Sequence, residues 1–136
     1  MTWLDGFAFE LSEEDRLAQQ TAREFSENEI LPIAPELDRN HRFPTELIPK
    51  LGALGFMGVT VPAELGGSGL SQIAYCLIVE ELAAACASTA VIVSAHNSLC
   101  LWPICEFGSS AQKATYVPDL AAGKKIGCFA LSEPGT

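Results

Sequence analysis

Residues 82–105 read LAAACASTAVIVSAHNSLCLWPIC, and no charged side chain occurs between Glu81 and Glu106. This run is longer than the roughly 20 residues that a helix needs to cross a bilayer. His96 and Asn97 lie inside it, however, and polar side chains at that depth are costly in lipid. We therefore predict two buried helices joined by a short break, which form part of a protein core rather than a membrane anchor.

Helix start and stop signals on both sides of this run predict further helices. Ser12, followed three residues later by Asp15, is typical of a capped helix start, and Pro32 and Pro35 should end or kink that helix near Ile30. The other predicted starts and ends are Phe43–Glu46 to Gly55, Ser71 to about Ala85, Ala87–Thr89 to an end or kink near Pro103, and Ser109–Gln112 to Gly123.

Apolar residues at helical spacing predict which faces of these helices are buried. Helices this apolar must pack on one another, so the fold class is mainly α, an antiparallel helical bundle. The residues expected to face the core are Leu17, Ala18, Thr21, Ala22, Phe25, Leu47, Ile48, Leu51, Leu54, Ile73, Ala74, Leu77, Ile78, Leu82, Val91, Ile92, Ala95, Leu99, Tyr116, Val117 and Leu120.

Composition narrows the function classes. The chain has 136 residues, 49% of them hydrophobic, and a net charge of −9, which argues against nucleic acid or an anionic membrane as a partner. Met1–Asp5 is neither basic nor long and apolar, so we predict a cytoplasmic protein without a targeting peptide. Five cysteines form no C-x-x-C pair and are expected to be reduced, buried thiols: Cys76, Cys86, Cys100, Cys105 and Cys128.

The C-terminal residues change from helical to strand character. Residues 126–132 are apolar on both alternating faces, which predicts a strand buried on both sides, and Pro134 ends it. A single strand needs neighbours for its backbone groups. We therefore expect an N-terminal α-helical domain over residues 1–123 and the first strand of an incomplete β-domain over residues 124–136.

Three segments together resemble acyl-CoA dehydrogenases, most closely the short-chain, butyryl-CoA branch. They are FMGVTVPAELGG at residues 56–67, EELA at 80–83 with CAST at 86–89, and FALSEPG at 129–135. The last resembles the first half of the family's flavin-binding signature, before its Gly-Ser-Asp. The resemblance covers nearly the whole chain and implies the N-terminal part of an enzyme that removes hydrogens from Cα and Cβ of short-chain acyl-CoA thioesters in fatty acid β-oxidation.

The resemblance also implies a cofactor and partners. FAD would accept the hydride, an electron-transferring flavoprotein would accept the electrons, and the full-length enzyme would be a homotetramer. Backbone groups of Leu131 and Ser132 and the Ser132 hydroxyl would bind the flavin ring. The catalytic base is expected beyond Thr136, and Glu133 is not nominated for that role. The predicted cofactor-binding residues are Phe129, Ala130, Leu131, Ser132, Glu133, Pro134, Gly135 and Thr136.

Other interpretations stay open at this level. The glycine-rich residues 63–69 lack the Lys-Ser/Thr of a phosphate-binding loop and favour a structural turn. His96 is expected to be a hydrogen-bonded core residue, although its segment could border the acyl-chain end of the substrate pocket, where Trp102 could limit chain length. The alternatives to a dehydrogenase are a non-catalytic helical binding module, a flavin oxidase, or a branched-chain or decarboxylating acyl-CoA dehydrogenase.

Overall fold

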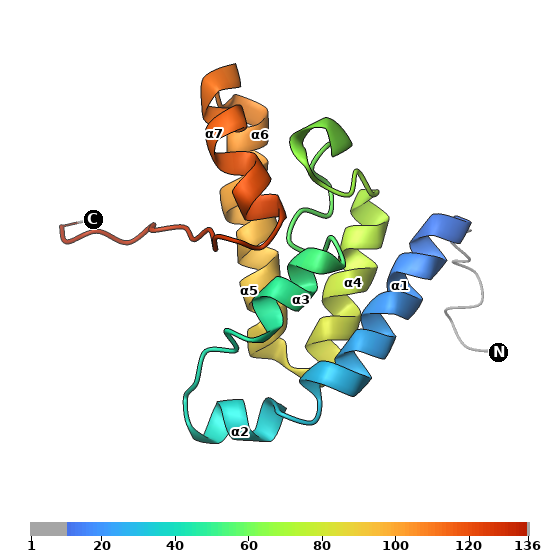
Figure 1. The fold of residues 1–136 in the computed structure, drawn as a ribbon. Coiled ribbons are helices and arrows are strands. Elements are labelled where there is room, and N and C mark those ends of the chain that lie inside the picture. Colours follow the sequence, from blue (N-terminus) through green and yellow to red (C-terminus); the bar gives the residue numbers. More distant parts are fainter. Residues whose placement is uncertain (1–10, 136) are drawn as a thin grey trace, which may run out of the picture.

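The computed structural model describes residues 11–135 and shows a helical bundle with an extended C-terminal segment (Figure 1). Helices α1 and α4 lie side by side, α5 packs against α4, and α6 pairs with α7. The elements are α1 (Glu13–Phe25), η2 (Ser26–Ile30), α2 (Ala34–Arg39), α3 (Leu47–Ala53), η3 (Ala63–Leu65), α4 (Gln72–Ala85), α5 (Ala87–Ser94), η4 (Ala95–Leu101), α6 (Trp102–Phe107) and α7 (Ser110–Ala121).

Helix α1 begins at the predicted cap. Ser12 Oγ accepts from the Asp15 N–H at 3.0 Å, and the Ser12 N–H donates to the Asp15 carboxylate at 3.2 Å. Asp15 also accepts from the hydroxyl of Ser71, the N-cap of α4, at 2.6 Å, so it joins the starts of both helices. The hydrogen bonds from Ser71 and Ser12 lower the pKa of Asp15. At its other end α1 runs into the π-helical turn η2, which ends at Ile30 before Pro32, as predicted.

The break between the two apolar helices is confirmed at Cys86, which has extended backbone angles between α4 and α5. Of the predicted end or kink near Pro103, the end is not found, because the helix continues from Ala87 to Phe107. The π-helical segment η4 precedes the proline, the Trp102 N–H bonds to the Asn97 carbonyl, and Pro103 lies in the first turn of α6. Inside a continuous helix a proline removes one backbone hydrogen bond, and the π-helical turn before Pro103 is where the bonding register changes from four residues to five.

This continuous helix is long and apolar enough to cross a membrane by length and composition. Its inner face nevertheless packs on the other helices and carries two buried polar side chains, His96 and Asn97. That arrangement is typical of a core helix in a bundle.

The buried face of this helix differs from the predicted one. Val91 and Leu99 are 64% and 47% exposed, whereas Ala90, Val93 and Leu101 are buried. An all-round apolar helix gives no periodic signal for its inner face, and the π-helical turn shifts the phase further. The same error occurs at single positions of the other predicted stripes, which are otherwise largely buried. The exposed residues are Leu17, Leu54, Ile73 and Tyr116.

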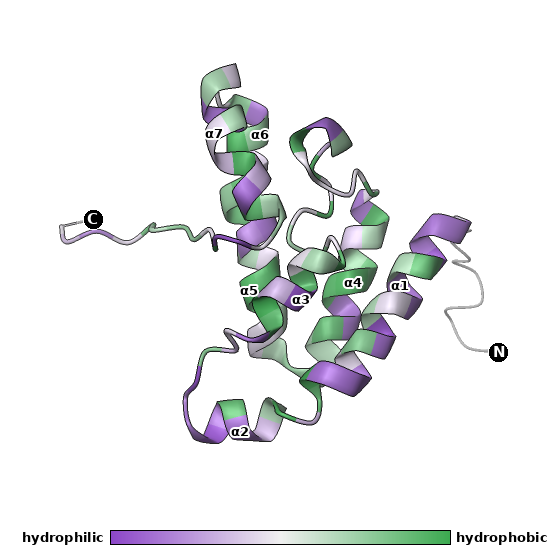
Figure 2. Ribbon diagram, viewed as in Figure 1, coloured by the Kyte–Doolittle hydropathy of each residue, from purple (hydrophilic) through white to green (hydrophobic). Residues whose placement is uncertain are grey.

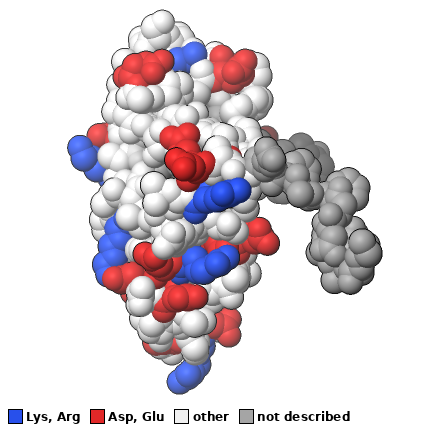
Figure 3. Space-filling model, turned by 90° about the vertical axis from the view of Figure 1, so that its right-hand side faces the viewer, with Lys and Arg blue, Asp and Glu red and all other residues white. Residues whose placement is uncertain are grey.

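The hydrophobic core has two parts. The larger part joins the inner faces of α1, α3, α4 and α5, and the smaller part, under α7, contains Val61, Leu101, Val117, Leu120 and Ala121. Apolar residues line the facing sides of α3, α4 and α5, and polar residues lie along the outer side of α1 (Figure 2). Charged side chains of both signs are interspersed on the face that carries α1 (Figure 3).

Helix α7 starts at the predicted Ser109–Gln112 capping box and ends at Gly123, whose φ of 68° suits a residue without a Cβ. The strand predicted for residues 126–132 is not formed within the described range. This segment is extended and largely exposed, because no neighbouring strand lies beside it to pair with its backbone. The helical class is confirmed, and the division into domains at residue 123 stays a prediction.

All five cysteines are free thiols, as predicted, but none is fully buried. Cys76 and Cys128 are exposed, and the other three are partly exposed. The prediction of burial therefore holds only in part: Cys86, Cys100 and Cys105 pack against the edges of the core, whereas Cys76 and Cys128 do not.

Candidate functional site

Segment η4 places two buried polar side chains at consecutive positions, His96 at 0% and Asn97 at 4% exposure. Neighbouring residues of a helix project in different directions. His96 therefore contacts the chain that leaves α7, while Asn97 contacts the loop that follows α3. One helical turn thus holds two separate parts of the fold.

The His96 ring joins the end of α7 to the C-terminal segment. Its Nδ1 accepts from the Gly127 N–H at 2.9 Å, and its Nε2 lies 3.2 Å from the Leu120 carbonyl. Because Nδ1 is the acceptor, the ring proton lies on Nε2 and is donated to Leu120. Burial lowers the pKa of His96 below 6.5, although the hydrogen bond to Leu120 acts in the opposite direction. The prediction of a hydrogen-bonded core histidine is confirmed.

Gly127 lies directly on η4. A Cβ at this position would overlap the Cys100 side chain and would lie 3.5 Å from His96 Nδ1. Burial raises the pKa of the Cys100 thiol. The close approach of backbone to helix requires glycine at position 127 and fixes where the following residues begin.

Both polar atoms of the Asn97 side-chain amide form hydrogen bonds within the protein. Nδ2 donates to the carbonyls of Phe56 and Val93 at 2.9 Å each, and Oδ1 accepts from the Val59 N–H at 3.0 Å. These bonds hold the loop after α3 against the helix.

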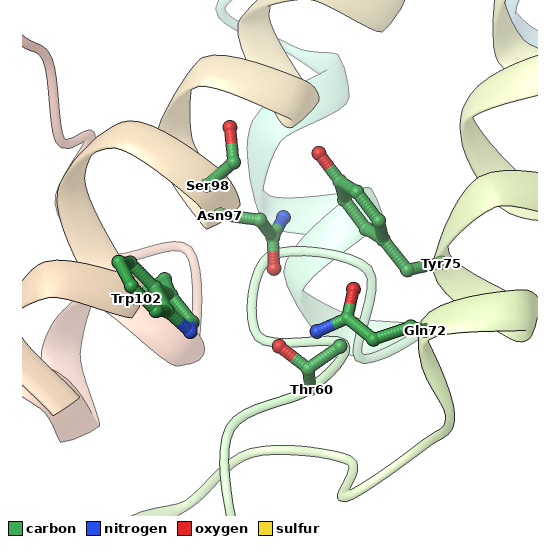
Figure 4. Close-up of a pocket in the computed structure, with 6 residues that line it drawn as sticks. All are labelled: Thr60, Gln72, Tyr75, Asn97, Ser98 and Trp102. Atoms are coloured by element: carbon green, nitrogen blue, oxygen red, sulfur yellow. The ribbon is translucent and has the colours of Figure 1, made fainter. Parts of the chain in front are cut away.

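A cavity of about 300 Å³ opens beside Asn97, between α4, η4 and the loop after α3 (Figure 4). Gln72 and Tyr75 come from α4, Thr60 comes from the loop, and Trp102 lies on the opposite side (Figure 4). The lining carries no charged side chain among the described residues: Thr60, Gln72, Tyr75, Asn97, Ser98 and Trp102.

Several polar atoms of this lining are already bonded to the helix. The Tyr75 hydroxyl lies 3.1 Å from Ser94 Oγ, and Ser98 Oγ donates to the Ser94 carbonyl at 2.7 Å. The rings of Tyr75 and Trp102 supply apolar surface. A neutral cavity with a few fixed polar groups suits a small uncharged group and not a phosphate.

The predicted flavin segment lies beyond Gly127 and is exposed. Phe129 is 55% and Leu131 is 76% exposed, and Ala130, Ser132, Glu133, Pro134 and Gly135 are exposed as well. Thr136 lies outside the described residues. The structure thus keeps these residues together on one extended segment, with backbone groups that are not part of a sheet.

The remaining sequence interpretations concern structural groups. Glu81 accepts from Arg23 Nη2 at 2.6 Å and from Gln19 at 3.0 Å, so it lies at the polar edge between α1 and α4. Glu80 and His41 are exposed.

The glycine-rich residues 63–69 form a turn that begins with η3. The amides of Ser68 and Gly69 donate to the carbonyls of Gly58 and Val61 at 2.9 Å each. Amides that are used in this way cannot cradle a phosphate, so the prediction of a structural turn is confirmed.

Sequence reasoning missed Gln72 and Tyr75. These two residues are three positions apart on α4, so they share a helix face, and neither belongs to the predicted apolar stripe. A polar-aromatic pair at that spacing, facing the run that contains Asn97, was the signal that could have found them. The link from His96 to Gly127 had no sequence signal, since it joins residues 31 positions apart.

Residues 12–124 match the family model described as the acyl-CoA dehydrogenase N-terminal domain. This chain belongs to the acyl-CoA dehydrogenase family. The predicted family is therefore confirmed, and the helical bundle is the family's N-terminal helical domain. The matched range includes residues 56–67 and 80–89, whereas the flavin segment at 129–135 lies beyond it and stays a prediction.

Curated relatives of this acyl-CoA dehydrogenase chain include short-chain specific enzymes. The mitochondrial short-chain specific acyl-CoA dehydrogenase of Mus musculus is 52% identical over 93% of the chain, and the short-chain specific enzyme of Clostridium acetobutylicum is 47% identical over the same share. The chain spans 31% and 33% of those relatives' lengths.

Solved structures share the fold. Butyryl-CoA dehydrogenase from Megasphaera elsdenii superposes with a TM-score of 0.86 at 37% identity, over 94% of this chain and 34% of that one. The acyl-CoA dehydrogenase of Bacillus anthracis complexed with FAD gives 0.87 at 36% identity, over 93% and 22%. A chain in the structure of the electron transferring flavoprotein of Acidaminococcus fermentans gives 0.90 at 39% identity, over 95% and 34%.

Proposed function

We propose that this chain is the N-terminal part of a flavin-dependent acyl-CoA dehydrogenase that oxidises short-chain acyl-CoA thioesters at Cα and Cβ. The observation that carries the proposal is the double role of η4. His96 fixes the start of the predicted flavin segment through Gly127, and the next residues, Asn97 and Ser98, line the uncharged cavity. One helical turn therefore brings a cofactor segment and a substrate cavity into fixed relation.

The residues of the C-terminal segment fit a flavin. Within the described range, residues 129–132 form no backbone hydrogen bond to another element, so their amides and carbonyls are free to meet a heteroaromatic ring edge. Leu131 and Ser132 would bind the ring, with the Ser132 hydroxyl as an additional polar group. FAD, when bound, accepts the hydride, and the residues of this chain bind and orient it.

The cavity beside Asn97 suits the acyl end of the substrate. Its uncharged lining favours a short hydrocarbon chain, and the indole of Trp102 forms one of its walls. Short-chain specificity of the curated relatives supports this assignment.

The expected partners follow from the same proposal. An electron-transferring flavoprotein would receive the electrons, which the structural similarity to a chain in such a protein's structure supports. The full-length enzyme would be a homotetramer in the cytoplasm that associates with neither membrane nor nucleic acid. The catalytic base would come from residues beyond Thr136.

Purified full-length protein tests the function directly. We expect a yellow protein whose flavin absorbance bleaches when butyryl-CoA is added without oxygen. A colourless protein would contradict the proposal. Bleaching only with branched or dicarboxylic acyl-CoA would indicate another subclass of acyl-CoA dehydrogenase. Peroxide formation in air at the turnover rate would indicate an oxidase.

A further inference from the structure

We propose that His96 is a positioning residue for the flavin: its Nδ1 holds the Gly127 amide and thereby sets the path of residues 129–135 toward the cofactor. This inference rests on the proposed function. It names His96 Nδ1 as the atom that aligns the cofactor segment.

The two ring nitrogens of His96 bind different parts of the chain. Nε2 bonds to the Leu120 carbonyl inside the same helical bundle, which stabilises the end of α7. Nδ1 bonds to Gly127, on the segment that leaves the bundle. Among the described residues, the Cys100 thiol also interacts with the Cys128 backbone. The bond from His96 to Gly127 is the first of these two contacts along the segment, so it sets where the segment leaves the bundle.

The surroundings hold the ring in one tautomer. His96 is fully buried, and Cys100 closes the other side of Gly127. A protonated ring would place an N–H against the Gly127 N–H, and burial opposes that charge. A neutral acceptor therefore points at position 127, two residues before the predicted flavin contacts begin.

Three substitutions in the full-length protein separate the tasks. His96→Asn keeps an acceptor near the position of Nδ1 and loses the donor to Leu120. His96→Gln places a donor near Nε2 and loses the acceptor to Gly127, and His96→Phe loses both. The control is Val93→Ala, which truncates an equally buried side chain one turn earlier on the same helix.

The primary readout is the FAD dissociation constant, measured by flavin fluorescence on reconstitution of the apoprotein. We expect His96→Asn to stay within about twofold of wild type, and His96→Gln and His96→Phe to bind FAD about tenfold more weakly. Val93→Ala should lower Tm without weakening FAD binding. If FAD affinity falls in step with Tm across all four variants, or if the Gln and Phe variants bind like wild type, the proposal is wrong.

Hydrogen–deuterium exchange of the wild-type protein gives a second test, which does not depend on whether the variants fold. The Gly127 amide should remain protected in the apoprotein, and rapid exchange there would overturn the proposal. A wild-type protein that protects Gly127 but binds no FAD would show that the proposed function has failed, and that the bond is structural only.

Discussion

Two buried polar side chains fix the local geometry around η4. His96 and Asn97 are surrounded by apolar groups, yet each has specific partners that join segments far apart in sequence. An unpaired polar group in such a place is costly, so these bonds select one arrangement of loop and helix.

The pH dependence of stability should report on His96. Its pKa is about 6.5 in the unfolded chain and lower in the folded one, so between these values the unfolded state binds more protons. The free energy of unfolding should therefore fall as pH decreases below 6.5, by at most about 1.4 kcal/mol per pH unit. Thermal melts from pH 7.5 to 5 would check this as the difference between wild type and His96→Asn, since both share the contribution of carboxylates such as Glu81, whose pKa is lowered by Arg23. The lowered pKa of Asp15 acts only at more acidic pH.

Asn97→Ala should destabilise the protein by roughly 3 kcal/mol, because it leaves the Val59 N–H and the Phe56 carbonyl without partners in a buried site. Ser98→Ala is the matched control, since it loses only a bond to the carbonyl one turn earlier. Urea unfolding of both variants measures the difference. Equal losses for the two variants would contradict this reading of Asn97.

Trp102→Ala should extend the range of acyl chains that the full-length enzyme accepts, because the indole lines the cavity. The ratio of kcat/KM for octanoyl-CoA to that for butyryl-CoA should rise about tenfold or more, in line with several added methylene contacts. Phe43→Ala provides a control, since that exposed ring lies outside the cavity. An unchanged ratio would place the acyl chain elsewhere.

At the scale of elements, the sequence predicted where helices begin and end more accurately than it predicted which side of each helix is buried. The serine caps at Ser12, Ser71 and Ser109 were predicted because capping depends on residues three apart. The inner face of α5 was not, since its side chains are apolar all round and only tertiary packing selects one face. The cavity was only partly predictable for the same reason: Asn97 and Trp102 lie in a conspicuous run, whereas Gln72 and Tyr75 contribute through the packing of α4.

The contact between α3 and the end of α7 gives an element-scale prediction. In open space Gly52→Ala would stabilise a helix by up to about 1 kcal/mol, but here a Cβ would overlap the carbonyl of Ala122. We expect a loss of about 1–3 kcal/mol instead. Ala53→Gly, at the neighbouring exposed position, should lose about 1 kcal/mol through propensity alone. A gain in Tm for Gly52→Ala would show that α3 and α7 can separate freely.

At the scale of the whole molecule, the helical domain supplies one edge of the proposed cofactor site. Residues 129–135 are exposed in this structure and have no second wall beside them. Residues 1–136 alone should therefore bind FAD poorly or not at all, whereas the full-length protein should retain it. Equilibrium dialysis of both proteins against FAD measures this, and stoichiometric flavin on the short chain would contradict it.

The placement of His96 and Asn97 on one turn has an evolutionary consequence. A substitution at Asn97 changes the cavity wall directly beside the residue that anchors the cofactor segment, so acyl-chain preference and cofactor binding are coupled at this turn. Divergence in acyl-chain preference should instead accumulate on the opposite wall, at Gln72 and Tyr75, and at Trp102 one turn beyond the anchor. Homologues with altered substrate range would then differ at those three positions while the turn that holds Gly127 keeps its acceptor.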